Sequence, residues 1–190
     1  MAYFHFFLFL IMRLFSPLVA VLAGAALLFN ASGALAQDKA PEDKSKRPSP
    51  PATASAVVNG TTVTIDYSKP AAKGRKVFGE LVPYGQVWRT GANEATTFTV
   101  SKAVKIEGKT LPAGKYGLFT IPTATAWTVI FNKVPNQWGA FKYSAADDVL
   151  RVSVPAKKTA APVEVFDITI DKSGVVAMKW ENSEADFTVK

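Results

Sequence analysis

From residue 55 to the carboxyl terminus, the sequence consists of short runs in which apolar and polar residues alternate. In residues 61–67, TTVTIDY, the apolar side chains of Val63, Ile65 and Tyr67 alternate with threonine and aspartate. A period of two over four to eight residues is the pattern of a half-buried β-strand. Further runs rich in β-branched or aromatic residues lie at 95–102, 115–121, 126–133, 148–154, 163–171, 175–180 and 185–190. These runs predict an all-β fold.

Turn residues separate these runs. Asn59-Gly60 lies between two strand-like segments, which is a strong signal for a two-residue hairpin. Other turns are indicated at 107–109, 112–114 and 171–174, and no sustained helical period follows residue 55. The sequence therefore predicts a single domain over 55–190, an antiparallel β-sandwich or flattened barrel of about eight or nine strands.

Residues 68–94 interrupt the alternation. This segment, SKPAAKGRKVFGELVPYGQVWRTGANE, shows no obvious strand, and it is long for a loop in a compact domain. Long irregular loops of this kind tend to be functional or to cover part of the fold. We therefore expect the segment to lie across one end or face of the sheet and to hold the main polar site.

The amino-terminal segment has the features of an export signal. An apolar run at 17–29 is followed by Ala-Leu-Ala at 34–36, the pattern of a signal peptide that is cleaved before Gln37. A start at Met12 fits this pattern better than a start at Met1, so residues 1–11 are interpreted as a misassigned start. The alternative is that the segment stays uncleaved and anchors the chain in a membrane. Cleavage predicts a periplasmic or secreted protein, with no membrane contact beyond the signal segment.

Residues 37–54 differ from the rest in composition. The sequence QDKAPEDKSKRPSPPATA is rich in proline and charge and contains no bulky apolar residue. Such a segment buries too little apolar surface to fold by itself. It predicts a disordered spacer between the signal peptide and the domain.

The chain lacks the residue types that many enzymes and metal sites require. It contains no cysteine, and its one histidine, His5, lies in the predicted signal peptide. Without imidazole or thiolate, a Ser-His-Asp or Cys-His mechanism cannot be assembled, and neither can the usual zinc, copper, haem or iron–sulfur ligand sets. We therefore expect no metal and no other cofactor, and a fold that is stable without disulfides.

The charge points to an anionic partner or to none. The net charge of +7 falls by one, to +6, when Arg13 leaves with the signal peptide. This charge fits either a scattered solvated surface or attraction to an anionic envelope polymer. Nucleic acid is not expected, because the chain has no arginine-rich helix or known binding module and is predicted to be exported.

The densest polar cluster is WRTGANE, residues 88–94. In one interpretation, Arg89 and Glu94 form a partly buried ion pair across a turn in which Asn93 adopts a left-handed conformation, and Trp88 packs in the core or as a lid. In the other, Trp88 stacks on a sugar while Arg89, Asn93 and Glu94 bind its hydroxyls or an acidic group. Both interpretations remain open from the sequence.

Two further positions are candidates for ligand binding. Arg75 lies in the basic cluster KGRK, residues 73–76, which either receives a sulfate, phosphate or carboxylate or is simply solvated. Trp138 lies in a predicted loop, NQWG, where an exposed ring is suited to stacking, although core or edge packing is the commoner outcome.

These residues favour non-catalytic binding of an envelope or extracellular carbohydrate. A second hypothesis is glycan cleavage, with Glu94 as a weak catalytic candidate and Glu80, Asp147 or Asp148 as its partner. Adjacent Asp147 and Asp148 point to opposite sides if extended, so they do not form a ready pair. A third hypothesis is a scaffold domain that binds a protein through a sheet edge.

Several of these stretches together resemble a known protein family. They are SKPAAKGRKVFGELVPYGQVWRTGANEATTF, LPAGKYGLFTIP, WTVIFNKVPNQWG, DVLRVSV, APVEVFDITI and KWENSEADFTV. The sequence from Ser49 onward resembles the exported bacterial proteins of domain-of-unknown-function family 2911. Members of that family often carry a histidine after Ser-Pro, where this chain has Pro51. The resemblance implies a secreted, mostly β domain and no particular activity.

Overall fold

A computed structural model describes residues 42–190. The predicted signal peptide, residues 1–36, and the first part of the predicted spacer, residues 37–41, lie outside the described residues. The strands are β1 (Pro51–Val58), β2 (Thr61–Ser68), β3 (Thr97–Val100), β4 (Val104–Ile106), β5 (Lys109–Leu111), β6 (Gly114–Pro122), β7 (Ala126–Asn132), β8 (Asp148–Ile170) and β9 (Val175–Thr188). Two 3₁₀ turns, η1 (Lys44–Lys46) and η2 (Ala145–Asp147), complete the described elements.

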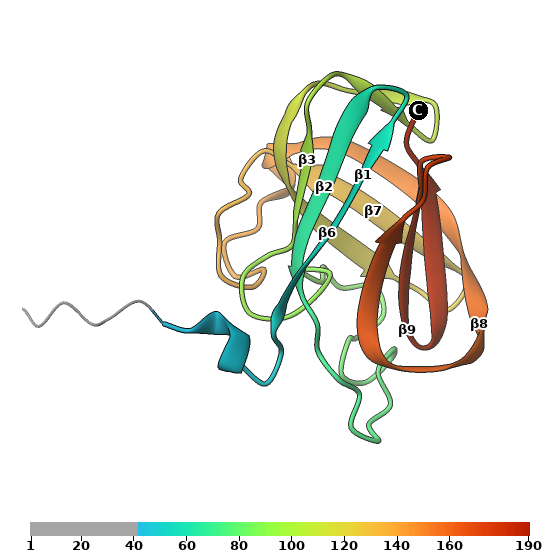
Figure 1. The fold of residues 1–190 in the computed structure, drawn as a ribbon. Helices are drawn as coiled ribbons and strands as arrows, with labels where there is room; N and C mark the ends of the chain where they lie inside the picture. The colour runs from blue at the N-terminus through green and yellow to red at the C-terminus, as the bar shows by residue number, and fades with distance from the viewer. Residues whose placement is uncertain (1–41) are drawn as a thin grey trace, which may run out of the picture. The chain divides into compact units, whose positions relative to one another are not determined.

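Seven of the strands form one antiparallel sheet in the order β1-β2-β3-β6-β7-β8-β9, and β4 and β5 form a small second sheet (Figure 1). The hairpin predicted at Asn59-Gly60 joins β1 to β2, with Val58 opposite Thr61. Both turn residues have positive φ, 49° for Asn59 and 75° for Gly60, as a primed two-residue turn requires.

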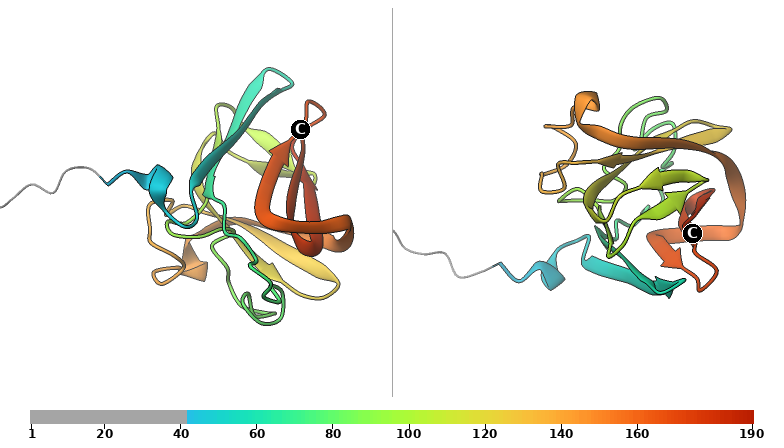
Figure 2. Two further views of the ribbon diagram at one scale, coloured as in Figure 1. Left: turned by 60° about the horizontal axis from the view of Figure 1, so that its bottom comes forward. Right: turned by 90° about the horizontal axis from the view of Figure 1, so that it is seen from above.

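The large sheet curls so that β1, at one edge, approaches β8, near the other edge (Figure 2). Past the end of β2, Ala71 forms a bridge with Val165 of β8. The hydroxyl of Tyr67 on β2 donates to Oδ1 of Asp167 on β8 at 3.0 Å. The prediction of an antiparallel β-sandwich or flattened barrel is thus confirmed, with its layers formed by a single curled sheet.

The interior of the curl is rich in aromatic residues. Trp127 and Trp180 are fully buried. Residues 68–94, which we call the irregular segment, contribute Phe78 and Trp88 to the same cluster. The ring of Trp88 stacks on Trp180 with centroids 5.8 Å apart, and Phe78 lies 4.9 Å from Trp127. The irregular segment therefore packs on the sheet through buried aromatic side chains, and burial of apolar surface is the main stabilising contribution in folding.

The structure differs from the predicted strands in three places. The runs at 148–154 and 163–171 belong to one strand, β8, and those at 175–180 and 185–190 fall within or at the end of β9. The polar stretch between the first two runs pairs through its backbone and has register shifts, so it carries no alternating pattern. Strands β4 and β5 have three residues each, too few for a period of two to be recognised.

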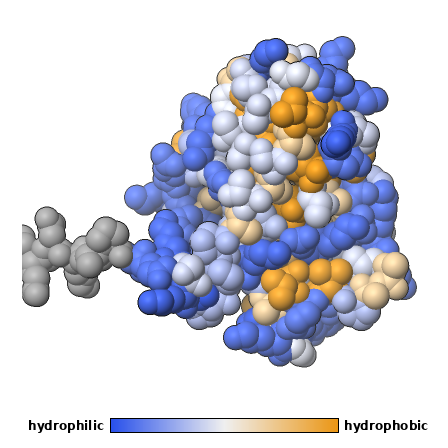
Figure 3. Space-filling model, in the orientation of Figure 1, coloured by the Kyte–Doolittle hydropathy of each residue, from blue (hydrophilic) through white to orange (hydrophobic). Residues whose placement is uncertain are grey.

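Part of the predicted spacer is placed against the domain, which corrects its boundary at residue 54. Strand β1 begins at Pro51, because its small residues pair with β2 through the backbone. Before it, Asp43 caps η1 by accepting from the backbone N–H of Ser45 at 3.2 Å. Figure 3 shows mostly hydrophilic residues where this segment meets the domain, and apolar residues in two patches elsewhere on the same face. Composition missed these contacts because they are polar.

Candidate functional site

A groove crosses the outer face of the sheet beside Glu94. It consists of two adjoining cavities of about 230 and 330 Å³, which share Glu94, Ala95 and Thr97. The first is also lined by Lys44, Pro51, Asp66, Tyr67, Ser68 and Lys115, and the second by Pro135, Asn136, Gln137 and Trp138. We call these residues together the Glu94 groove.

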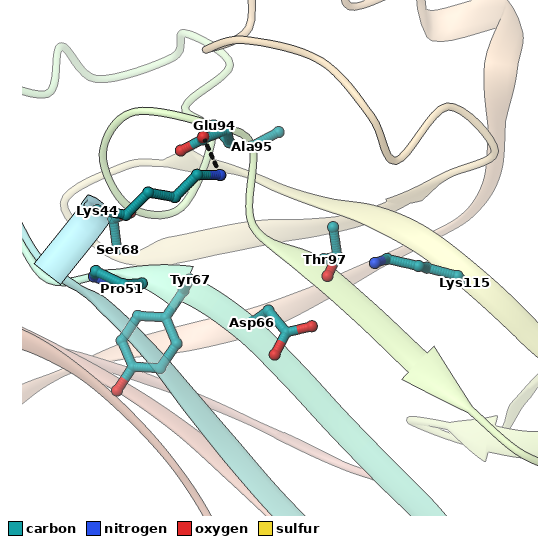
Figure 4. A pocket seen from close by; sticks show the side chains of 9 residues that line it. All are labelled: Lys44, Pro51, Asp66, Tyr67, Ser68, Glu94, Ala95, Thr97 and Lys115. Carbon is teal, nitrogen blue, oxygen red and sulfur yellow. Dashed lines mark hydrogen bonds and ion pairs between the residues drawn. The ribbon is translucent and has the colours of Figure 1, made fainter. Parts of the chain in front are cut away.

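Strands β2, β3 and β6 form the floor of the Glu94 groove. Asp66 on β2 lies directly opposite Thr97 on β3, so both side chains project from the same face of the sheet. Figure 4 shows Asp66, Thr97 and Lys115 close together at one end, and Glu94 with Lys44 at the other. The ring of Tyr67 points away from them, as alternation along β2 requires.

Backbone hydrogen bonds fix one wall of the groove. Glu94 forms an antiparallel bridge with Trp138, and the N–H of Ala95 donates to the carbonyl of Gln137 at 2.9 Å. The N–H of Gly139 donates to the carbonyl of Asn93 at 3.0 Å. Asn93 has φ 59°, which confirms the left-handed conformation predicted for it. The end of the irregular segment is thereby joined to the loop that carries Trp138.

Glu94 is bound by the chain's own amino-terminal segment. Lys44 Nζ lies 2.8 Å from Oε1 of Glu94, and Arg47 Nη1 lies 2.7 Å from Oε2. Arg47 also donates from Nε and Nη2 to Glu42, at 2.8 and 2.6 Å. Its guanidinium lies 5.7 Å from the centre of the Trp138 ring, within cation–π distance. Only 12 % of the Arg47 side chain is exposed, and Lys44 and Pro51 of the same segment line one side of the groove.

These cations set the ionisation of Glu94. Partial burial by itself raises the pKa of this carboxyl, but hydrogen bonds from Lys44, from its own backbone N–H and from Arg47 outweigh that effect. The pKa falls from its ordinary value of 4.5 to about 2. Glu94 is consequently a carboxylate throughout the neutral range.

The predicted ion pair between Arg89 and Glu94 is wrong. Arg89 is half-buried, forms no ion pair with any residue in 42–190, and has a buried Nε without a hydrogen-bond partner. Burial lowers the pKa of its guanidinium. The nearby turn holds its ends together through the backbone instead, since the N–H of Thr96 donates to the carbonyl of Arg89 at 3.2 Å.

Two other predicted ligand residues lie away from the groove. Trp88 is only 8 % exposed and packs in the aromatic core, where its Nε1–H donates to the carbonyl of Gly91. It therefore cannot stack on a sugar. Arg75 is exposed, but its guanidinium donates to the carbonyls of Ala71 and Ala72 within its own loop.

The structure brings Asn93, Glu94 and Trp138 together. The amide of Asn93 donates to the carbonyl of Ser49 at 2.9 Å and to Oγ of Ser68 at 3.3 Å, so it holds the amino-terminal segment in place. Trp138 has 56 % of its surface exposed. Of the predicted residues, Trp138 is the one that offers a ring to a ligand.

Two side chains in the groove have unpaired polar atoms. Oγ1 of Thr97 and Oε1 of Gln137 are buried, and neither forms a hydrogen bond with another described residue. A buried polar atom without a partner is costly, and a ligand or a water molecule commonly satisfies it. The sequence prediction missed both residues, together with Asp66 and Lys115. Strand alternation could have placed Asp66 and Thr97 on the outer face, but not beside Glu94.

The carboxylates proposed as catalytic partners do not meet Glu94 in the groove. Asp148 accepts hydrogen bonds from Asn132, Tyr143 and Arg151, and Glu80 pairs with Lys76; neither lines the groove. Asp147, a further candidate from the sequence, pairs with Lys133. The second carboxylate that does line the groove is Asp66, which accepts from Thr53 at 2.8 Å.

Within residues 42–190, no group of three or more histidine, cysteine, aspartate or glutamate side chains is placed to hold a metal ion. In the same part of the chain, none of the helices has the length and apolar character needed to span a membrane.

Comparison with known protein families gives a match over most of the domain. A family described as "Protein of unknown function (DUF2911)" matches residues 49–189, which include all nine strands and most of the Glu94 groove. Pro51 lines the groove. No curated protein and no solved structure gives a significant match.

Proposed function

The chain belongs to the DUF2911 family, and because that family has no known function, we propose from the geometry of the groove that the domain binds a carbohydrate without cleaving it. The observation that carries this proposal is the exposed ring of Trp138 beside two unpaired buried polar atoms, those of Thr97 and Gln137. Sugars present an apolar ring face and peripheral hydroxyls, which need these two kinds of partner.

The dimensions and charges of the groove support a sugar over a compact ion. Its two cavities each have space for about one sugar ring, and their lining mixes polar groups with proline and tryptophan. Lys115 donates at one end, while Asp66 and Asn136 provide acceptors for hydroxyls. No single charge dominates the groove, because Glu94 is already paired with Lys44 and Arg47.

The state of Glu94 supports binding over catalysis. A general acid must hold a proton near neutral pH, but the pKa of Glu94 is about 2. A carboxylate held by two cations is also a poor base, because hydrogen bonds to its charged form reduce its proton affinity. In this proposal Glu94 accepts hydroxyl hydrogen bonds and fixes the amino-terminal wall.

The expected setting is the cell envelope or the extracellular space. This part of the proposal depends on the predicted signal peptide at 1–36 and on the basic net charge. A polysaccharide of the envelope is then the partner that the domain would meet. The groove itself is neutral enough for an uncharged segment of such a polymer.

The test is titration of the domain with neutral gluco-, manno-, xylo- and N-acetylglucosamine tetrasaccharides, by calorimetry and by two-dimensional NMR. The variant Trp138→Ala should abolish measurable binding. Phe141→Ala is the matched control, since Phe141 is 84 % exposed in the same loop but does not line the groove. No binding by the wild-type protein at millimolar sugar, or equal losses in the two variants, would contradict the proposal.

A further inference from the structure

Another cavity lies between the irregular segment and the β8–β9 hairpin. Its volume is about 420 Å³. It is lined by Lys76, Phe78, Tyr84, Ala124, Ala156, Lys157, Lys158, Glu181, Asn182 and Ser183. We call it the lysine cleft; it shares no residue with the Glu94 groove.

Strand pairing and hydrogen bonds fix the two walls of the lysine cleft. On one side, Lys158 of β8 lies opposite Ser183 of β9. On the other, the backbone N–H of Val77 donates to Oε2 of Glu181 at 3.0 Å, and the N–H of Gly85 donates to the carbonyl of Pro122 at 2.9 Å. The cleft is thus formed by segments about 100 residues apart in the sequence.

Positive charge in the cleft is only partly neutralised. Lys157 pairs with Asp186 at 2.7 Å, whereas Lys76 lies 3.5 Å from Glu80, and both of these side chains are 63 % exposed. An exposed pair of this length holds a lysine weakly. Lys158 forms no ion pair with any residue in 42–190. Glu181 is the acidic residue in the lining, and one of its oxygens already accepts from Val77.

Other polar groups in the cleft are also without partners. The hydroxyls of Tyr84 and Ser183 and the amide of Asn182 form no side-chain hydrogen bond with the rest of the described chain. Together with Lys76 and Lys158, they supply N–H and O–H donors from the irregular segment and from the β8–β9 hairpin. The lining itself has three lysines against one carboxylate, Glu181, and this excess of cationic donors favours an oxyanion.

An apolar wall accompanies these donors. The ring of Tyr84 lies over Gly79, where an added Cβ would meet ring carbon Cε2 at 3.0 Å. Phe78, Ala124 and Ala156 complete this apolar part of the lining. Inorganic phosphate needs no such wall, whereas a sugar ring packs well against an aromatic or methyl surface.

We propose that the lysine cleft binds a sugar bearing a phosphate or sulfate group. Lys76 and Lys158 hold the oxyanion, Asn182 and Ser183 contact it or the neighbouring hydroxyls, and Tyr84 packs on the sugar ring. A volume of about 420 Å³ accommodates one or two sugar units. The inference does not depend on carbohydrate binding in the Glu94 groove, since the two sites have separate residues.

The test is a set of calorimetric titrations with glucose 6-phosphate, glucose 6-sulfate, glucose and inorganic phosphate. We expect the two anionic sugars to bind, and the double variant Lys76→Ala, Lys158→Ala to lose at least about tenfold in affinity for them. The control Lys102→Ala, Lys172→Ala removes the same charge from exposed positions outside the cleft and should change affinity less than about twofold.

Tyr84→Ala separates the sugar contact from the charge. This variant should reduce the affinity for glucose 6-phosphate and leave the affinity for inorganic phosphate unchanged. Equal losses in the two lysine double variants, or no binding of either anionic sugar, would overturn the proposal. Inorganic phosphate binding as tightly as glucose 6-phosphate would overturn the role of the sugar. Trp138→Ala should have no effect here, so failure of this proposal is distinguishable from failure of the first.

Discussion

The Glu94 groove and the lysine cleft differ in which of their polar groups are paired within the chain. In the groove, the central carboxylate is bound by Lys44 and Arg47 from the amino-terminal segment, and the unpaired atoms are buried ones on Thr97 and Gln137. In the cleft, Lys158 and Tyr84 are exposed and unpaired within the described chain, while Lys76 is weakly paired. The central charge of the groove is neutralised by ion pairs within the chain, whereas the lysine charges of the cleft face solvent.

This difference separates what each site can recognise. Because its central charge is neutralised by internal ion pairs, the groove can bind a ligand mainly through hydrogen bonds and ring stacking, which suit an uncharged ligand. Unpaired ammonium groups give the cleft a net attraction for anions, which weakens as salt increases. If both proposals hold, a single domain would contact neutral and charged parts of a polymer at separate places.

The largest expected effect concerns the packing of Tyr84 in the lysine cleft. Gly79 has φ 91° and contacts the Tyr84 ring, so Gly79→Ala adds both backbone strain and a clash. We expect a loss of about 1–3 kcal/mol in the free energy of unfolding, together with loss of anionic sugar binding. Urea denaturation and calorimetry measure the two quantities.

The control for this substitution is Gly74→Ala. Gly74 has φ 70° but no atom within 4 Å of an added Cβ. It should lose only about 1 kcal/mol, from backbone strain, and keep full ligand affinity. If both variants kept their affinity, Tyr84 would not be part of the site.

A smaller loss of stability is expected from removing the Glu94 carboxylate at the centre of the groove. Glu94→Ala takes away two charge-assisted hydrogen bonds, but the carboxylate is 40 % exposed, so the loss of stability should be on the order of 1 kcal/mol. Hydrogen exchange at residues 44–50 should accelerate at the same time. Unchanged exchange there would show that the backbone contacts alone hold the segment.

The contribution of Glu94 should depend on pH in a defined window. Its pKa is lowered from 4.5 to about 2 in the folded protein, so its stabilisation is fully present above pH 4.5 and is lost as the pH falls toward 2. The difference in unfolding free energy between wild type and Glu94→Gln should therefore shrink over this range. Glu42 and Asp43 titrate in both proteins, so a difference that stayed constant would contradict the role given to Glu94.

The smallest effect is a change in access to Trp138 without a large change in stability. The other three tryptophans are buried, so acrylamide quenches mainly the fluorescence of Trp138. Arg47→Ala removes the guanidinium beside this ring and should increase the quenching constant. Lys46→Ala is the control, because Lys46 is 82 % exposed and pairs only with Asp43. Equal quenching in both variants would place Arg47 away from the ring in solution.

Predictions based on local patterns agreed best with the structure. The alternation in 61–67 gives β2, Asn59-Gly60 gives a hairpin, and Asn93 adopts the left-handed conformation expected of a turn asparagine. Each of these depends on interactions within a few residues, so neighbouring side chains suffice to encode them. The boundary at residue 54 was wrong because small, polar residues pair through the backbone and leave no pattern.

Predictions of partners between distant residues agreed less well. Arg89 and Glu94 are five positions apart, yet the cations that bind Glu94 come from positions 44 and 47. Trp88 and Trp138 are indistinguishable as isolated residues, but one is in the core and the other is exposed. Choosing among several possible arginines, lysines and tryptophans requires the path of the chain, which no local pattern contains.

The sequence by itself determined that this is an antiparallel β domain with one long irregular segment and no thiol or imidazole after residue 5, because residue type and short-range periodicity are properties of the chain alone. Only the tertiary structure decided which side chains share a site. The Glu94 groove joins residues from 44 to 138, and the lysine cleft joins residues from 76 to 183. The physical reason is that curling the sheet, to bury its aromatic face, fixes the distances between residues that the sequence holds far apart.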